Sequence, residues 1–162
     1  MWPSSGGQRI VKTIDPTPPH DDEYAKGRTK LGHGLVMTAP GVPTMLYGSE
    51  WLEDVGFGAG TDGGDNRIDW AHKTQYPGIF RYYTDLIHVR RENSALKANA
   101  ARQVYHVNDA GNVVIFQRYS LDGNVLVVLA NFSNTDYASY DLGMPQPGAW
   151  YQLLNSEATK YE

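Results

Sequence analysis

The sequence contains no cysteine, and this absence excludes several kinds of chemistry before any motif is considered. Without thiols there is no disulfide framework, no thiolate metal site and no cysteine nucleophile. Apolar runs long enough to span a bilayer are missing too. The first residues lack the apolar region of a signal peptide, so a cytoplasmic location is expected. The net charge of −4 provides no basic surface for nucleic acid or an anionic membrane, and neither is an expected partner.

Hydrophobic residues make up 41% of the 162 positions, which suits one globular domain or a small domain with part of another. Aromatic side chains are plentiful, with 11 tyrosines and 4 tryptophans. Flat rings of this kind cover the apolar faces of sugars, but they also fill the cores of β-sandwiches. Composition alone favours the core role.

Two helices are predicted in the first half of the chain. An acidic N-cap at Asp21 or Asp22 precedes a helix in which Leu31 and Leu35 lie one turn apart. Three glycines weaken this helix, so close packing against a neighbour must hold it. A second, amphipathic helix begins near Pro77, a residue that suits the first helical turn.

A short apolar run joins these helices. Residues 42–47 follow a Pro-Gly turn and are too short for a helix, so they are predicted to form a buried strand that ends in Glu50 and Trp51. Residues 52–75 then form a long loop rich in glycine and aspartate. Loops of this length inside a compact protein are usually functional.

After Asn93 the pattern changes to the alternation of β-strands. Short turns separate the runs, which indicates a meander of antiparallel hairpins. The predicted strands cover residues 104–107, 113–119, 125–132, 137–142 and 150–154. The aromatic residues of this region, namely Tyr105, Phe116, Tyr119, Phe132 and Trp150, are predicted to lie in its core.

No complete catalytic or metal-binding motif is visible in the sequence. The five histidines have no compact metal spacing, and Leu52 replaces the second glycine of a nucleophile elbow around Ser49. Asp62 and Asp65, with Asn66, resemble a calcium loop, but Thr74 stands where the bidentate glutamate should be. No metal and no cofactor are therefore expected, although a different calcium geometry stays open.

His20 and Asp21 form an adjacent pair that could serve acid–base chemistry. An aspartate at this place is more simply the cap of the helix that follows. The pair is therefore interpreted as loop and cap.

Three segments together carry a family resemblance: LGHGLVMTAPGVPTMLYGSEWLED, DNRIDW and FRYYTDLIHVRR. They resemble the end of the catalytic barrel in the α-amylase superfamily of glycoside hydrolases (glycoside hydrolase family 13). The variant is most similar to 1,4-α-glucan branching enzymes and their close relatives. The resemblance implies a mixed fold, in which residues 1–92 are the last strand and helices of a (β/α)8 barrel. Residues 93–162 would then form an antiparallel all-β sandwich, which ends early enough to be incomplete.

The same resemblance implies that the catalytic residues are absent. Family members use an aspartate nucleophile, a glutamate acid/base and an aspartate in a His-Asp pair, and all three are expected upstream of Met1. His20 does not supply the pair, because it follows Thr-Pro-Pro, which cannot lie in a central strand. The chain alone is therefore expected to be inactive.

Four residues remain as candidates for contact with substrate or for support of the site: Glu50, Trp51, Asp69 and Trp70. Asp65, Asn66 and Arg67 are interpreted as groups that order the loop. The implied partner is an α-glucan such as glycogen, starch or a maltooligosaccharide, bound through the parent enzyme. Branching, hydrolysis and a purely binding or supporting β-module stay open. Self-association is a further expectation, because a strand without neighbours invites pairing.

Overall fold

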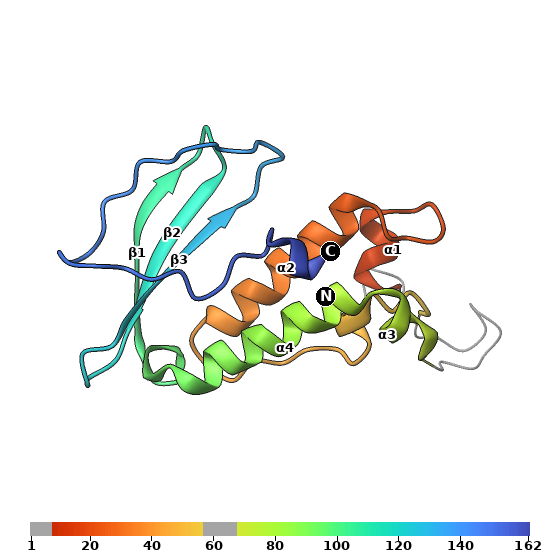
Figure 1. The fold of residues 1–162 in the computed structure, drawn as a ribbon, viewed down its shortest axis with the longest axis horizontal. Helices are drawn as coiled ribbons and strands as arrows, with labels where there is room; N and C mark the ends of the chain where they lie inside the picture. Colours follow the sequence, from red (N-terminus) through yellow and green to blue (C-terminus); the bar gives the residue numbers. More distant parts are fainter. Residues whose placement is uncertain (1–7, 57–67) are drawn as a thin grey trace.

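The computed structural model describes residues 8–56 and 68–162. Helices gather at one end of the molecule and a single β-sheet stands at the other (Figure 1). A long C-terminal segment leaves the sheet and returns to the helices (Figure 1). This mixed arrangement of helices followed by an antiparallel sheet confirms the predicted fold class. No helix of the described part is long and apolar enough to cross a membrane.

The first long helix, α2 (Glu23–Thr38), begins where the sequence predicts. Asp22 is its N-cap and accepts a hydrogen bond of 2.6 Å from the backbone amide of Ala25. A Cβ added to Gly34 would lie 2.9 Å from the hydroxyl of Tyr82 on α4. One of the three glycines therefore permits the close packing that the sequence requires.

The second long helix, α4 (Pro77–Glu92), carries a proline in its first turn, as predicted. It lies beside α2, and two short helices, α1 (Ile10–Ile14) and α3 (Ala71–Gln75), lie near their N-terminal ends (Figure 1). The inward faces of these helices form one hydrophobic core. It contains Val11, Met37, Leu52, Tyr76, Ile79, Tyr82, Tyr83, Leu86 and Tyr161.

Residues 42–47 do not form the predicted strand. They pair with no described strand, and Val42 is 85% exposed. A strand needs a neighbour for its backbone amides and carbonyls, and the β-sheet of this chain lies elsewhere. Arg90 instead holds the preceding turn, with its guanidinium donating to the carbonyl of Gly41 at 2.6 Å.

The sheet contains three antiparallel strands in the order β1-β2-β3. They are β1 (Ala101–Asn108), β2 (Val113–Tyr119) and β3 (Val125–Asn131), which confirms the first three predicted strands. The turns contain Asn112 and Gly123 with φ of 53° and 86°, so each hairpin closes through a left-handed residue.

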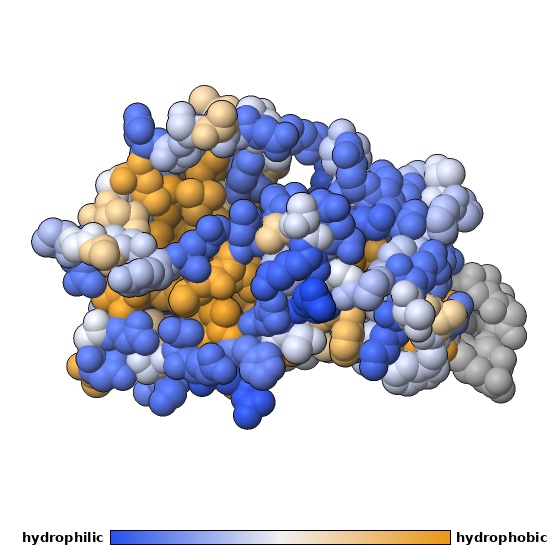
Figure 2. Space-filling view, in the orientation of Figure 1, coloured by the Kyte–Doolittle hydropathy of each residue, from blue (hydrophilic) through white to orange (hydrophobic). Residues whose placement is uncertain are grey.

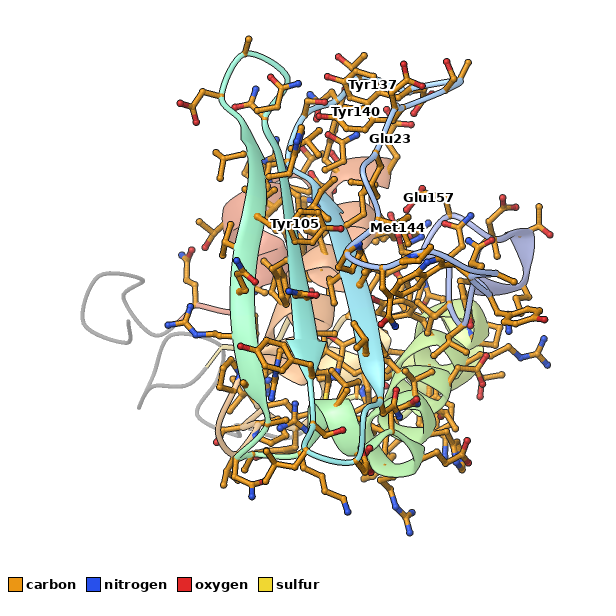
Figure 3. All side chains as sticks on the ribbon, turned by 90° about the vertical axis from the view of Figure 1, so that its left-hand side faces the viewer. Glu23, Tyr105, Tyr137, Tyr140, Met144 and Glu157 are labelled. Carbon is orange, nitrogen blue, oxygen red and sulfur yellow. The ribbon has the colours of Figure 1, made fainter. Side chains whose placement is uncertain are left out.

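The last two predicted strands are absent from the described sheet. Residues 137–142 and 150–154 are irregular and join no described strand, so one sheet stands where a sandwich was expected. Tyr137 and Tyr140 lie at the end of the sheet that carries the β1–β2 turn (Figure 3). The Tyr137 hydroxyl donates to the carbonyl of Gly111 at 3.0 Å. Side-chain contacts of this kind take the place of strand pairing.

The single sheet leaves an apolar surface open. Figure 2 shows it beside the sheet, framed by the C-terminal segment. Phe132 and Tyr119 are 50% and 39% exposed, so their predicted place in the core is wrong. A second sheet would have to cover these rings, and the described residues supply none.

The chain end packs into the helical part. Tyr161 is 1% exposed, and its hydroxyl donates to Asp85 Oδ2 at 2.7 Å. Lys160 donates to the same oxygen at 2.8 Å, and Lys30 donates to the carbonyl of Ser156 at 2.7 Å. The division into domains 1–92 and 93–162 stays a prediction.

Arg118 connects the sheet to the helices. Its side chain is fully buried, and its guanidinium donates to the carbonyls of Thr38 at 2.6 Å and Lys97 at 2.8 Å. The carbonyls of Ala100 and Ala101 accept two further bonds at 3.1 and 3.2 Å. The rigid, five-donor guanidinium therefore joins β2 to the end of α2.

Candidate functional site

A tight turn positions the candidate site residues. Gly48 has φ of 89°, and a Cβ there would lie 2.6 Å from Cβ of Glu53. The amide of Glu53 donates to the Gly48 carbonyl at 2.9 Å, which closes the turn around the short helix η1 (Ser49–Trp51). Glycine is required at this place, because a side chain would be both strained and blocked.

Trp51 and Trp70 form an aromatic pair. Trp51 is buried, at 4% exposure, and packs against Phe80 with ring centroids 6.2 Å apart. Trp70 lies 5.1 Å from Trp51 and is 65% exposed. The inner ring thus supports an outer ring that faces solvent, an arrangement suited to stacking on a flat apolar surface. Among the described residues, no group accepts a hydrogen bond from the Trp51 indole.

Glu50 borders a small pocket. This pocket has a volume of about 250 Å³ and is bordered by Met45, Phe80, Tyr83 and Ile87. The Glu50 Oε2 atom is buried and has no hydrogen-bond partner in the described part of the chain. Burial, together with charges that include Glu50, raises the pKa of Tyr83 above its usual range. Glu50 and Tyr83 therefore line a hollow that His88 and Arg91 also border.

Asp69 makes contacts that order the backbone around it. Its carboxylate accepts from the amide of Ala71 at 2.9 Å, and its own amide donates to Glu53 Oε2 at 2.8 Å. The carboxylate is also 3.8 Å from His72 Nε2. Asp69 therefore joins the turn after η1 to the start of α3.

His20 and Asp21 are held by structural contacts. The Nδ1 atom of His20 lies 2.8 Å from the carbonyl of Asp15, and Asp21 accepts from the Tyr76 hydroxyl at 3.1 Å. Burial and this hydrogen bond raise the pKa of Tyr76 to about 12. The adjacent Asp22, not Asp21, is the helix cap.

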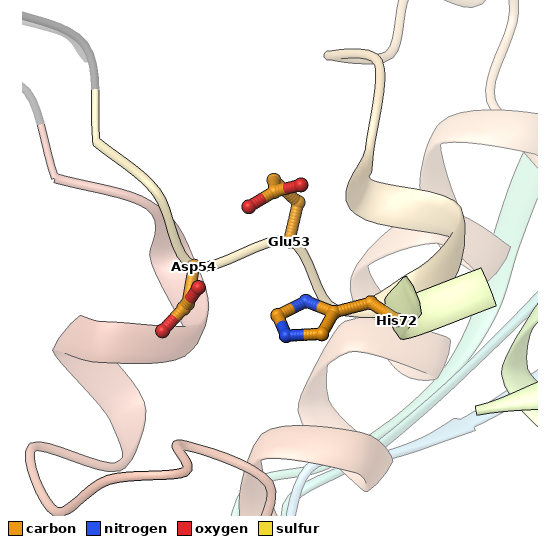
Figure 4. Close-up of side chains that lie close together, drawn as sticks. All are labelled: Glu53, Asp54 and His72. Carbon is orange, nitrogen blue, oxygen red and sulfur yellow. The ribbon is translucent and has the colours of Figure 1, made fainter. Parts of the chain in front are cut away.

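The structure brings together three residues that the sequence did not single out. Glu53, Asp54 and His72 each place a ligand atom within 4.8 Å of the other two (Figure 4). Their separation along the chain hides this cluster, since only the adjacent acids Glu53 and Asp54 are visible as a signal. The candidate calcium residues Asp62 and Asp65, with Asn66 and Arg67, lie outside the described residues.

Comparison with known proteins finds a family model that matches the C-terminal part of the chain. Residues 105–162 match the family model of the α-amylase C-terminal all-β domain. The resemblance of this chain to the α-amylase superfamily of glycoside hydrolases is confirmed.

Similar curated proteins include glucan branching enzymes. The 1,4-α-glucan branching enzyme of Rhodococcus jostii strain RHA1 is 31% identical over 155 residues, which cover 86% of this chain and 20% of the relative. The branching enzyme of Mycobacterium tuberculosis strain ATCC 25177 / H37Ra is 32% identical over 131 residues, covering 75% and 17%. The chain thus spans about a fifth of the length of these relatives.

Solved structures of two pullulanases share the fold. The Anoxybacillus sp. LM18-11 enzyme, in complex with maltotetraose, has a TM-score of 0.64 and 20% identity, over 78% of this chain and 20% of its own. The Bacillus acidopullulyticus enzyme has a TM-score of 0.59 and 22% identity, over 76% and 17%. At these identities the similarity supports the fold alone.

Proposed function

We propose that this chain is the C-terminal part of an α-glucan branching enzyme, which transfers α-1,4-linked chains to form α-1,6 branches. The observation that carries the proposal is the 31% identity to a branching enzyme across 86% of the chain. The reaction would proceed with retention, through a glycosyl intermediate on paired carboxylates. Those carboxylates are not assigned to any residue of this chain, which is proposed to be inactive by itself.

The chain's own contribution would be a glucan-contacting edge. Trp70 supplies an exposed ring and Trp51 holds it from below, with centroids 5.1 Å apart. Asp69 fixes the backbone that carries Trp70 through its bond to the amide of Ala71. Glu50 borders the neighbouring hollow. Stacking of the exposed ring on a glucose unit would follow from this arrangement.

Titration of the purified chain with maltoheptaose tests the edge directly. Trp70→Ala is expected to weaken binding at least about fivefold, because stacking contacts contribute about 1 kcal/mol or more. Tyr151→Ala is the matched control, since Tyr151 is 83% exposed but belongs to the C-terminal segment. Equal affinities in the wild type and in the Trp70 variant would remove Trp70 from the proposed site.

An activity assay tests the proposal that the chain is inactive by itself. The purified chain, incubated with amylose, is expected to form no α-1,6 linkages and to release no reducing ends. Branching or hydrolysis above that of a heat-denatured sample would show that a catalytic set lies within these residues.

A second candidate is a supporting module without sugar contact. It is favoured by the four backbone carbonyls that Arg118 binds between the sheet and the helices. In that case the β-part stabilises the helices, and a folded chain would give no heat signal with maltoheptaose. The titration above therefore separates the two roles.

A further inference from the structure

Two carboxylates and two imidazoles meet beside the turn that carries the candidate site. Glu53 and Asp54 follow η1, His72 lies in α3, and His20 precedes α2. In Figure 4 the His72 ring extends toward the two carboxylates. One ligand atom each of Glu53, Asp54 and His72 lies within 4.8 Å of the other two. The site draws on three segments, which is why no compact metal spacing appears in the sequence.

His20 presents an electron pair to this cluster. Its Nδ1 lies 2.8 Å from the backbone carbonyl of Asp15, and a carbonyl only accepts, so Nδ1 carries the proton. In the neutral ring Nε2 is then an acceptor. It faces Asp54 Oδ2 at 3.7 Å, and the His20 side chain is only 9% exposed. No other contact of this nitrogen is found in the described part of the chain.

The His72 ring also has one nitrogen beside an acceptor and one nitrogen without a partner. Its Nε2 lies 3.8 Å from the Asp69 carboxylate, which favours a proton on that nitrogen. Its Nδ1 is buried and has no hydrogen-bond partner among residues 8–56 and 68–162. Metal-binding histidines characteristically direct one ring nitrogen at a carboxylate or a carbonyl and the other at the ion.

In the described part of the chain, no hydrogen-bond donor is found between His20 Nε2 and Asp54 Oδ2. An imidazole nitrogen and a carboxylate oxygen at 3.7 Å repel unless a proton or a cation lies between them. Glu53, at 2% exposure, is already fixed, because its carboxylate accepts from the amides of Val55 at 3.0 Å and Asp69 at 2.8 Å. A cation would satisfy the remaining lone pairs.

We propose that Glu53, Asp54 and His72 bind one divalent transition-metal ion, with Zn²⁺ as the best fit, and that His20 faces Asp54 as a fourth group. Imidazole and carboxylate together suit zinc, whose ligand atoms lie about 2.0–2.2 Å from the ion. Ligands of a tetrahedral site are then about 3.4 Å apart. Asp54 and His72 are only half-buried, so their side chains can close the remaining gap.

The charge balance selects zinc over calcium or magnesium. Arg9 lies close enough to Glu53 and Asp54 to interact with both, and its positive charge offsets one carboxylate. Hard cations depend on several oxygen ligands and their charge. An imidazole nitrogen is an inner ligand for zinc, so zinc depends less on the acidic charge that Arg9 removes.

The bound ion would act as a structural clamp. It joins the loop after η1 to α3, and through His20 it reaches the start of α2. Because Glu53 and Asp54 directly follow η1, the ion would also fix the C-terminal end of the turn that carries Glu50 and Trp51. Zinc binding should therefore raise the temperature at which the chain unfolds.

Calorimetric titration of the whole chain with ZnCl₂, paired with thermal unfolding, tests the proposal. One ion per chain is expected, with a higher unfolding temperature in zinc and no comparable rise in CaCl₂ or MgCl₂. His72→Gln and Asp54→Asn should each weaken zinc binding at least about tenfold and abolish the rise. His88→Gln is the matched control, because the His88 side chain is 59% exposed on α4 and lies outside the cluster.

Using two variants keeps the test decisive even if one of them misfolds. Both keep side-chain size closely, and a circular dichroism spectrum checks that each is folded before titration. Should one fail to fold, the other still decides the outcome. Absence of saturable zinc binding, or unchanged zinc affinity in a folded cluster variant, would overturn the proposal.

Discussion

His33 is a buried titratable group that the candidate site does not use. Its ring stacks on Tyr83 with centroids 3.8 Å apart, and the residue is 5% exposed. Its Nε2 has no hydrogen-bond partner in the described part of the chain. Burial penalises the charged imidazolium and lowers the pKa of His33 to about 4.

This lowered pKa predicts a pH dependence of stability. Between pH 4 and pH 6.5 His33 is mostly protonated in the unfolded chain and mostly neutral in the folded chain. The free energy of unfolding therefore rises with pH across that window. The full contribution of neutral His33 to the unfolding free energy, about 3 kcal/mol, is present above pH 6.5 and is lost on acidification. His33→Gln should flatten this part of a urea-unfolding profile.

His88→Gln provides the comparison for that profile, because it removes a histidine whose side chain is 59% exposed. Its profile should follow the wild type. A His33 variant whose stability falls as steeply as the wild type between pH 6.5 and pH 4 would contradict the assignment.

At the scale of elements, the close packing of α2 on α4 depends on Gly34. Alanine is normally the better helix residue by about 1 kcal/mol. At Gly34, however, a Cβ would lie 2.9 Å from the Tyr82 hydroxyl, which donates to the carbonyl of Lys30 at 2.9 Å. Gly34→Ala is therefore expected to lower the unfolding free energy by about 1–2 kcal/mol.

Gly27 lies in the same helix with no atom within 4 Å of an added Cβ, so Gly27→Ala should stabilise by about 0.5–1 kcal/mol. In a Tyr82→Phe background the cost of Gly34→Ala should shrink, because the blocking hydroxyl is gone. Chemical denaturation of the four variants measures both effects. Equal shifts for the two glycines would refute the close approach as the cause.

Arg118 gives a second prediction at this scale. Arg118→Leu leaves four backbone carbonyls without their donor and should cost about 3 kcal/mol or more of unfolding free energy. Arg118→Lys should recover little, because an ammonium cannot reproduce the guanidinium fork. Arg102→Leu is the control: Arg102 lies opposite Arg118 on β1 and is exposed. A thermal melt with equal losses for Arg118→Leu and Arg102→Leu would exclude the bridging role.

The sequence predicts elements well where the pattern is local. Asp22 and Pro77 mark helix starts that depend on nearby backbone groups alone, and the hairpin turns depend on residues such as Gly123. Residues 42–47 and 137–142 depend instead on a neighbouring strand, which no local pattern reports. The zinc-binding candidates Asp54 and His72 were missed for a related reason, since loops far apart in sequence meet only in the fold.

At the scale of the whole molecule, the chain closes on itself. It leaves the helices at Glu92, builds the sheet, and returns to bury Tyr161 in the helical core. Gly78 on α4 allows this return, because a Cβ there would lie 1.9 Å from the carbonyl oxygen of Glu162. The C-terminal segment therefore contributes Tyr161 to the core that the helices form.

This closure predicts one cooperative unfolding transition. Arg118 and the returning C-terminal segment couple the two ends, so the helical circular dichroism signal and the hydrogen-exchange protection of β2 should be lost at the same urea concentration. Tyr161→Ala removes a buried ring and its bond to Asp85, and should lower stability by about 3 kcal/mol or more. The sheet and the helices should lose that stability together.

Tyr151→Ala provides the reference, because the ring is 83% exposed in the same C-terminal segment and its loss should cost less than about 0.5 kcal/mol. Two independent domains, 1–92 and 93–162, would instead give two transitions, and Tyr161→Ala would move only one of them. Hydrogen exchange resolved by segment distinguishes these results, because coupled parts lose protection of α4 and β2 at one common free energy, whereas independent parts lose it at two.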